Sequence, residues 1–158
     1  MRKIFLLFFI SAVCFFNSCK PSNDKIKNGI EIKESGLHIE EAFLTDDAGQ
    51  NIGDSNKVQI GERVCLRLVV DGWQLKDGKV FLDASQEVAT SSGNFLTSNP
   101  SILGPVYTDG ATPKDAKYVL LYQRIGRLDN SKDHVVITFK LWDKTSNKSV
   151  SGSYELYL

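Results

Sequence analysis

Short runs in which apolar residues alternate with other residues most constrain what this chain can fold into. Residues 135–142 place Val135, Ile137, Phe139 and Leu141 opposite Val136, Thr138, Lys140 and Trp142. Residues 64–70 place Val64, Leu66, Leu68 and Val70 opposite Cys65, Arg67 and Val69. Successive side chains of a strand point to opposite faces of its sheet, so a period of two predicts strands with one buried face.

Further runs and the residues between them fit the same pattern. Shorter runs of this kind cover residues 37–43, 80–82, 118–123 and 154–158, and Leu37, Ile39, Glu41 and Phe43 are expected to share one face. Turn-forming residues separate the runs. Asp77-Gly78 is typical of a type I′ turn, which closes a two-residue hairpin. Residues 113–116 are expected to form one helical turn, with Thr112 as its N-cap.

About seven or eight short strands, with few helices, predict an all-β fold: a single antiparallel β-sandwich. Residues 39–49 followed by 61–68 resemble the opening strands of bacterial immunoglobulin-like domains, and residues 139–143 through 152–156 resemble their final hairpin. The resemblance implies an immunoglobulin-like sandwich. It implies no particular function, because one fold serves many functions.

The first nineteen residues have a distinct layout. Arg2 and Lys3 precede an uncharged apolar run, Ile4 to Phe16, and Asn17-Ser18-Cys19 follows it. The run of about 13 residues is shorter than the roughly 20 that a transmembrane helix needs. The layout resembles the signal peptides of bacterial lipoproteins, including those of the Bacteroidetes, which are cut before a cysteine that receives lipid.

This resemblance implies a cleaved signal peptide at residues 1–18, a lipidated Cys19 with a flexible tether at residues 19–29, and a β-sandwich domain at residues 30–158. Two or more acyl chains, such as palmitate, hold a protein firmly on a membrane. Lys20, in place of an aspartate that would retain the protein at the inner membrane, favours the outer membrane of the cell envelope. Secretion with a free Cys19, or an uncleaved anchor, are the alternatives.

Charge and cysteine content narrow the class of protein. The chain has 19 basic and 19 acidic residues, and loss of the signal leaves 17 basic residues against 19 acidic ones. No basic face for nucleic acid is indicated. Once Cys19 carries lipid, Cys65 has no cysteine partner in the mature chain, so no disulfide is expected.

Residues that carry chemistry are sparse. His38 and His134 belong to no motif for nucleophilic or metal catalysis. Cys65 has an arginine on each side at two residues' distance, yet a lone strand cysteine usually packs as a small apolar residue. Residues 46–54 offer several oxygen ligands without the spacing of a calcium loop. We therefore expect no catalytic residues, no cofactor and no metal.

Aromatic residues and one long loop are the better candidates for binding. Trp73, Tyr107 and Trp142 are candidate stacking or anchoring side chains. Residues 90–117 are polar but hold several large apolar side chains. They are expected to form either an irregular edge strand with a crossover between sheets or a binding loop.

The leading functional hypothesis is a lipid-anchored, non-catalytic module that binds an envelope protein at the outer membrane. A carbohydrate-binding module of a surface glycan system is the first alternative, and an inhibitor of an envelope enzyme is the second.

Overall fold

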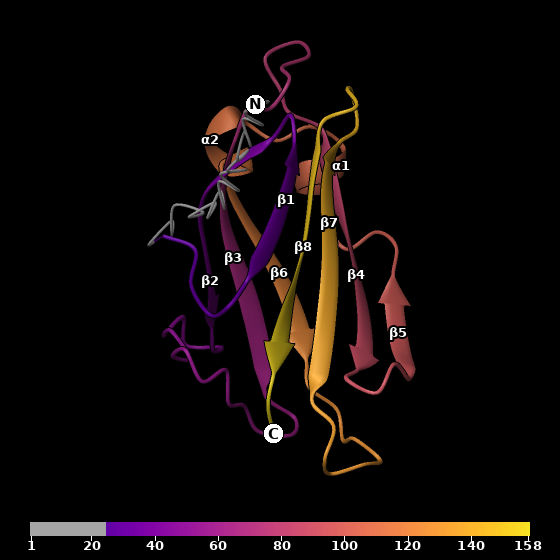
Figure 1. The fold of residues 1–158 in the computed structure, drawn as a ribbon. Helices are drawn as coiled ribbons and strands as arrows, with labels where there is room; N and C mark the ends of the chain where they lie inside the picture. Colours follow the sequence, from indigo (N-terminus) through magenta and orange to yellow (C-terminus); the bar gives the residue numbers. More distant parts are fainter. Residues whose placement is uncertain (1–24) are drawn as a thin grey trace, which may run out of the picture.

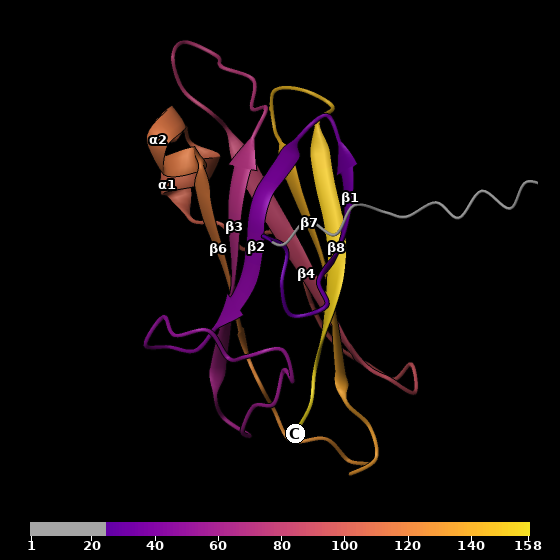
Figure 2. The same cartoon turned by 60° about the vertical axis from the view of Figure 1, so that its left-hand side comes forward.

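The computed structural model describes residues 25–158, so the predicted signal peptide at residues 1–18 and the predicted lipidation site Cys19 lie outside the described residues. Two antiparallel sheets pack face to face (Figures 1 and 2), which confirms the predicted all-β sandwich. In order across the larger sheet lie β1 (Glu31–Ser35), β8 (Ser149–Leu156), β7 (Val135–Asp143), β4 (Leu82–Thr90) and β5 (Phe95–Asn99). The smaller sheet holds β2 (His38–Thr45), β3 (Arg63–Asp71) and β6 (Tyr118–Arg124).

The connectivity is that of an immunoglobulin-type sandwich. If β2 to β8 are lettered A, B, C, C′, E, F and G, the smaller sheet reads A-B-E and the larger one reads C′-C-F-G. This order matches the immunoglobulin arrangement without its strand D. The extra strand β1 pairs with β8 at the other edge of the larger sheet. The missing strand leaves β6 as a sheet edge.

The alternating residues form the core between the sheets. In three of the predicted runs, the apolar residues of one face are buried: Val64, Leu66, Leu68 and Val70; Val119 and Leu121; Val135, Ile137, Phe139 and Leu141. Burying each such side chain stabilises the fold by about 1.5–3 kcal/mol. Leu158, the last residue of the predicted final face, is exposed instead.

The predicted face of residues 37–43 is wrong beyond Ile39. A register shift lies between Ile39 and Glu41, where β2 pairs with β3. The extra residue in such a bulge turns the following side chains to the opposite face. Ala42 and Leu44 are therefore buried in the core, while Phe43 lies on the outer face.

The predicted turns are confirmed. Lys76 and Lys79 exchange backbone hydrogen bonds of 2.9 and 3.0 Å. Asp77 and Gly78, between them, have positive φ of 53° and 75°, as a type I′ turn requires. Thr112 caps α2 (Pro113–Ala116) by accepting a hydrogen bond from the Asp115 amide.

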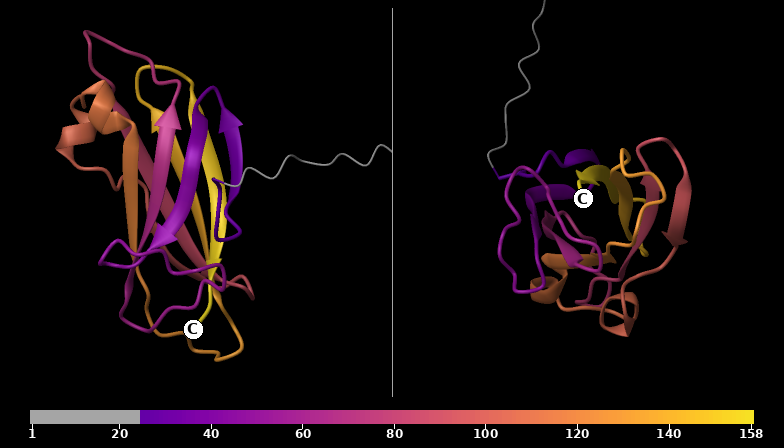
Figure 3. Two further views of the ribbon diagram at one scale, coloured as in Figure 1. Left: turned by 90° about the vertical axis from the view of Figure 1, so that its left-hand side faces the viewer. Right: turned by 90° about the horizontal axis from the view of Figure 1, so that it is seen from below.

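The segment 90–117 contains an edge strand followed by a crossover. Its strand β5 pairs with β4, and the chain then passes through α1 (Pro105–Thr108) and α2 to reach β6 in the other sheet. Figure 3 shows both short helices beside the upper end of the smaller sheet. The expectation of an irregular edge strand with a crossover is thus confirmed, and a binding role for this segment remains a prediction.

Residues 25–29, which were expected to belong to the tether, run along the outer edge of β2. Ile26 forms a parallel bridge with Ala42, and the buried Asn28 accepts a hydrogen bond of 2.9 Å from the Leu44 amide. The Asn56 side chain in turn donates to the carbonyl of Asn28 at 2.8 Å. The chain therefore enters the domain on the β2 side, away from β6. Within residues 25–158, no helix has the length and apolar character to cross a membrane.

Candidate functional site

We identify the outer face of the smaller sheet, which carries both aromatic and basic side chains, as the candidate site. Alternation along β3 directs Arg63, Cys65, Arg67 and Val69 outward, and alternation along β6 directs Tyr118, Leu120, Tyr122 and Arg124 outward. We call this surface the tyrosine–arginine face. It rests on paired strands, which hold side chains more precisely than loops do.

Two tyrosines stand out on this face. Tyr118 is 56% exposed and Tyr122 is 47% exposed, although both belong to a strand whose other side is core. Tyr118 lies opposite Val69, and Tyr122 lies opposite Cys65. Four residues along a strand correspond to about 13 Å, so both rings fit within one small contact area.

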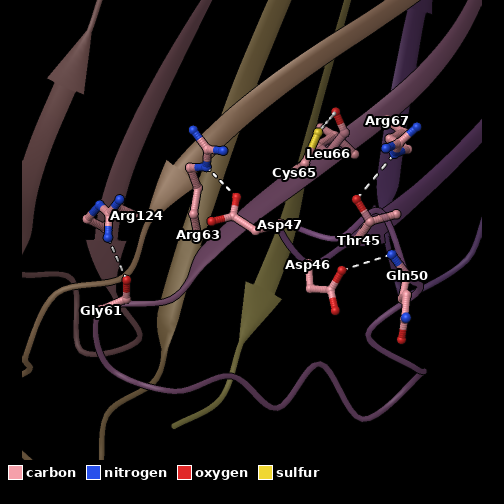
Figure 4. Close-up of polar contacts among 10 residues, drawn as sticks. All are labelled: Thr45, Asp46, Asp47, Gln50, Gly61, Arg63, Cys65, Leu66, Arg67 and Arg124. Atoms are coloured by element: carbon pink, nitrogen blue, oxygen red, sulfur yellow. Dashed lines mark hydrogen bonds and ion pairs between the residues drawn. The ribbon is translucent and has the colours of Figure 1, made fainter.

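Arg63 packs against one of these rings, that of Tyr122. The guanidinium carbon of Arg63 lies 4.8 Å from the centroid of the Tyr122 ring, within range of a cation–π interaction. Arg63 also forms a charge-assisted hydrogen bond with Asp47 (Figure 4). That bond, together with the charge of Asp47, raises the pKa of Arg63 above its ordinary value. The arginine is thus held in place over the tyrosine before any partner arrives.

Two further arginines lie on the same face without a carboxylate. Arg67 donates from Nε to Thr45 Oγ1 at 3.2 Å, and Arg124 donates to the Gly61 carbonyl at 2.8 Å (Figure 4). Among the described residues, neither forms an ion pair. Neutral oxygens leave the full positive charge of both guanidinium groups available to an incoming anion.

Cys65 lies in the middle of this face but is 2% exposed. Burial raises the pKa of its thiol, and the nearby Arg67 and Arg63 only partly oppose that effect. Its Sγ contacts the Leu66 carbonyl at 3.7 Å. The thiol therefore stays protonated at neutral pH and packs as a small apolar group, because the thiolate is the reactive form.

In the loop at residues 46–54, side-chain oxygen atoms accept hydrogen bonds from backbone amides of the same loop. Asp46 accepts a hydrogen bond of 2.8 Å from the Gln50 amide, and Asn51 accepts one of 2.7 Å from Gly53. Asp47 binds Arg63. Across residues 25–158, no group of three or more His, Cys, Asp or Glu side chains has a metal-binding arrangement.

Both histidines pair with glutamates on the surface. His38 Nδ1 lies 3.0 Å from Glu34, and His134 Nε2 lies 3.3 Å from Glu155. Partial burial raises the pKa of Glu34, but hydrogen bonds from the Ile39 amide and from His38 lower it. Together the hydrogen bonds outweigh the burial, so the net shift of the pKa is downward. His134 also stacks on Tyr157, with ring centroids 4.7 Å apart. The contacts of His38 connect β2 to β1, and the contacts of His134 connect the start of β7 to the end of β8.

The structure distributes the aromatic residues predicted from the sequence over different places. Trp73 is half-buried, and its Nε1 donates to the Ala116 carbonyl at 3.0 Å. Tyr107, in α1, is half-buried against the core, with its hydroxyl 3.5 Å from the Tyr118 carbonyl. Trp142 lies on the outer face of the larger sheet, opposite Asp83 and Ser149. The three side chains do not share one face, and their role in binding stays a prediction.

The exposed tyrosines of β6 were not among those predicted residues, although their signal is in the sequence. Tyr118, Leu120 and Tyr122 alternate with Val119 and Leu121. The aliphatic set is the core set, so the tyrosines must face away from it. Comparison of the chain with protein-family models and with curated proteins gave no match.

Proposed function

We propose that this protein is a non-catalytic, lipid-anchored module of the cell envelope that binds a protein partner through the tyrosine–arginine face. The carrying observation is the placement of exposed Tyr118 and Tyr122 on one face of a paired strand, with Arg63 held against the Tyr122 ring. Tyrosine and arginine are enriched among the residues that dominate binding energy in protein interfaces.

The neighbours of these residues support an interface core. On the same face, Leu120 lies between the two tyrosines along β6 and Val69 lies opposite Tyr118, and both are only partly buried. Such aliphatic side chains exclude water from the surrounding polar contacts when a partner covers them. Arg67, on the central strand, and Arg124, at the end of β6, supply cationic groups that favour an acidic surface on the partner.

The proposed membrane attachment through Cys19 fits this use. The chain enters the domain beside β2, with Ile26 bridged to Ala42, whereas β6 forms the opposite edge of the smaller sheet. A domain tethered at the β2 side leaves Tyr118 and Tyr122 accessible to another envelope protein. The outer membrane is the location favoured by Lys20.

The test is a crosslinked pull-down from the envelope of the cells that make the protein. Parent protein is compared with a variant carrying Tyr118→Ser and Tyr122→Ser, and with a matched control carrying Thr138→Ala and Lys140→Ala on the outer face of the larger sheet. We expect the tyrosine variant alone to lose a specific protein. Equal recovery by all three would contradict the proposal.

Carbohydrate binding is the second candidate, since two exposed tyrosine rings on one strand also suit stacking on sugars. A glycan array separates the two functions. Binding of defined glycans by parent protein, lost in the tyrosine variant, together with no protein in the pull-down, would favour the carbohydrate function.

A further inference from the structure

An apolar cleft lies at one end of the sandwich. At this end β4 and β6 end and β5 and β7 begin (Figure 1). Its volume is about 220 Å³. Side chains from both sheets and from the segment after β6 line it, among them Val88, Leu96, Ile125, Leu128 and Val135. Leu96 is 46% exposed, so a large aliphatic side chain at this cleft faces solvent.

The size of the cleft restricts its occupant. Pockets for drug-sized ligands and cofactors measure about 300–1,000 Å³, whereas a cavity of about 150 Å³ already accepts benzene. A cleft of 220 Å³ therefore matches one bulky apolar side chain better than a cofactor.

The cleft lies between two sheet edges. β5 ends the larger sheet and β6 ends the smaller one. The Lys117 carbonyl accepts a hydrogen bond from the Val70 amide on β3. The Ile125 amide donates a hydrogen bond to the Glu62 carbonyl, just before β3. Alternate residues of an antiparallel strand point their backbone groups to opposite sides, so those of Tyr122 and Arg124 point away from β3. In agreement, the Arg124 carbonyl accepts a hydrogen bond of 2.9 Å from its neighbour's side chain, Gln123 Nε2.

The charged residues that line the cleft itself are basic, whereas Asp129 and Asp133 line the adjoining pocket that shares Arg127. Among the described residues that line the cleft, Arg124 and Arg127 are the charged ones, and no carboxylate is present. Arg127 is exposed and forms no ion pair or hydrogen bond with another described residue. An exposed, unpaired guanidinium beside an apolar cleft complements a carboxylate that lies next to an apolar side chain.

We propose that this cleft binds an extended segment of a partner protein, which inserts one bulky apolar side chain between the sheets and places an Asp or Glu against Arg127. The segment runs beside β6, where the strand D of other immunoglobulin-type sandwiches would lie, and adds a strand to that edge. Strand addition of this kind gains affinity from backbone hydrogen bonds and specificity from side-chain pockets. The cleft does not use the side chains of Tyr118 or Tyr122, although the added strand would pair with the backbone of β6, and the proposal does not depend on the function proposed above.

The test is selection of a displayed library of random peptides, about one strand in length, on the mature protein. We expect enrichment of peptides with a Leu, Ile or Phe next to Asp or Glu. Each enriched peptide is then titrated against parent protein and two cleft variants, Arg127→Glu and Thr97→Trp. Thr97 lines the cleft and is only partly buried, so a tryptophan there fills the space while leaving the core intact.

Both cleft variants should weaken peptide binding at least tenfold. Lys140→Glu, a charge reversal on the outer face of the larger sheet, should leave it unchanged. Amide chemical shifts should move at Val88, Leu96 and Ile125 when peptide is added. Failure to enrich such peptides, or peptides that bind both cleft variants as tightly as parent, would overturn the proposal, whatever the pull-down with the tyrosine variant shows.

Discussion

The guanidinium of Arg63 lies 4.8 Å from the centroid of the Tyr122 ring, across two neighbouring strands of the smaller sheet. Asp47 holds the same arginine from the loop after β2. The ring of Tyr122 is thereby fixed on the surface, which lowers the entropy that a partner must remove on binding. This arrangement is the physical basis for treating the face as a preformed interface.

This contact predicts a change in the titration of Tyr122. Partial burial and the neighbouring Cys65 raise the pKa of Tyr122, while the positive charge of Arg63 opposes them by favouring the tyrosinate. Arg63→Gln removes that charge, so the pKa of Tyr122 should rise further. The shift is measured by NMR or by ultraviolet absorbance during an alkaline titration. Arg127→Gln, which lies away from Tyr122, is the control and should leave the midpoint in place.

Gly152 of β8 lies opposite Phe139 of β7, and the ring covers the glycine. A Cβ at Gly152 would lie 2.6 Å from Phe139 Cζ and would also meet the Glu31 carbonyl of β1. Gly152→Ala should therefore lower the free energy of unfolding by about 1–3 kcal/mol, as overpacking does. Urea unfolding measures the change. Gly104→Ala, where a Cβ meets nothing within 4 Å, is the matched control, and an equal loss in both variants would refute the explanation.

Gln86 and Tyr154 form a polar pair inside the core. Gln86 Nε2 donates to the Tyr154 hydroxyl at 3.4 Å, and Gln86 Oε1 has no partner among the described residues. Tyr154→Phe alone should cost about 1–3 kcal/mol, because it also leaves the amide donor unpaired. Combining it with Gln86→Leu should recover most of that loss, since both polar groups are then gone. A double variant less stable than Tyr154→Phe would show that this pair contributes net stability.

Cys19→Ser tests the proposed anchor. The variant should lose metabolic labelling by palmitate and pass from the membrane fraction to the soluble fraction, because without acyl chains little apolar surface remains to hold it. Cys65→Ser is the control: its thiol is buried and is not expected to carry lipid, so labelling should persist. Membrane retention of the Cys19 variant without label would instead indicate that the apolar run Ile4 to Phe16 is an uncleaved anchor.

The regular strands were predictable because their alternation is local. Val64 to Val70 and Val135 to Leu141 each bury one face without interruption, and Asp77-Gly78 requires a particular turn whatever surrounds it. The bulge after Ile39 was not predictable, since it depends on how β2 pairs with β3. Strand β5 was ambiguous because both its aromatic and its aliphatic side chains are exposed at an edge.

The candidate site was only partly visible in the sequence for a similar reason. Alternation places Tyr118 and Tyr122 on the solvent side of their strand, but their approach to Arg63 requires the register between β3 and β6. The cleft beside Leu96 brings together four strand ends from two sheets, which no local pattern encodes. Contacts between distant segments are the information that the sequence pattern lacks.

The most direct test of the proposed function is photo-crosslinking in living cells. A photoreactive amino acid replaces Tyr118 in one strain and Lys140 in another, so that the probe lies on the outer face of either the smaller or the larger sheet. We predict a discrete crosslinked protein from position 118 and none of that mass from position 140. The same products from both positions, or no protein product from position 118, would contradict the assignment of the tyrosine–arginine face as a protein-binding surface.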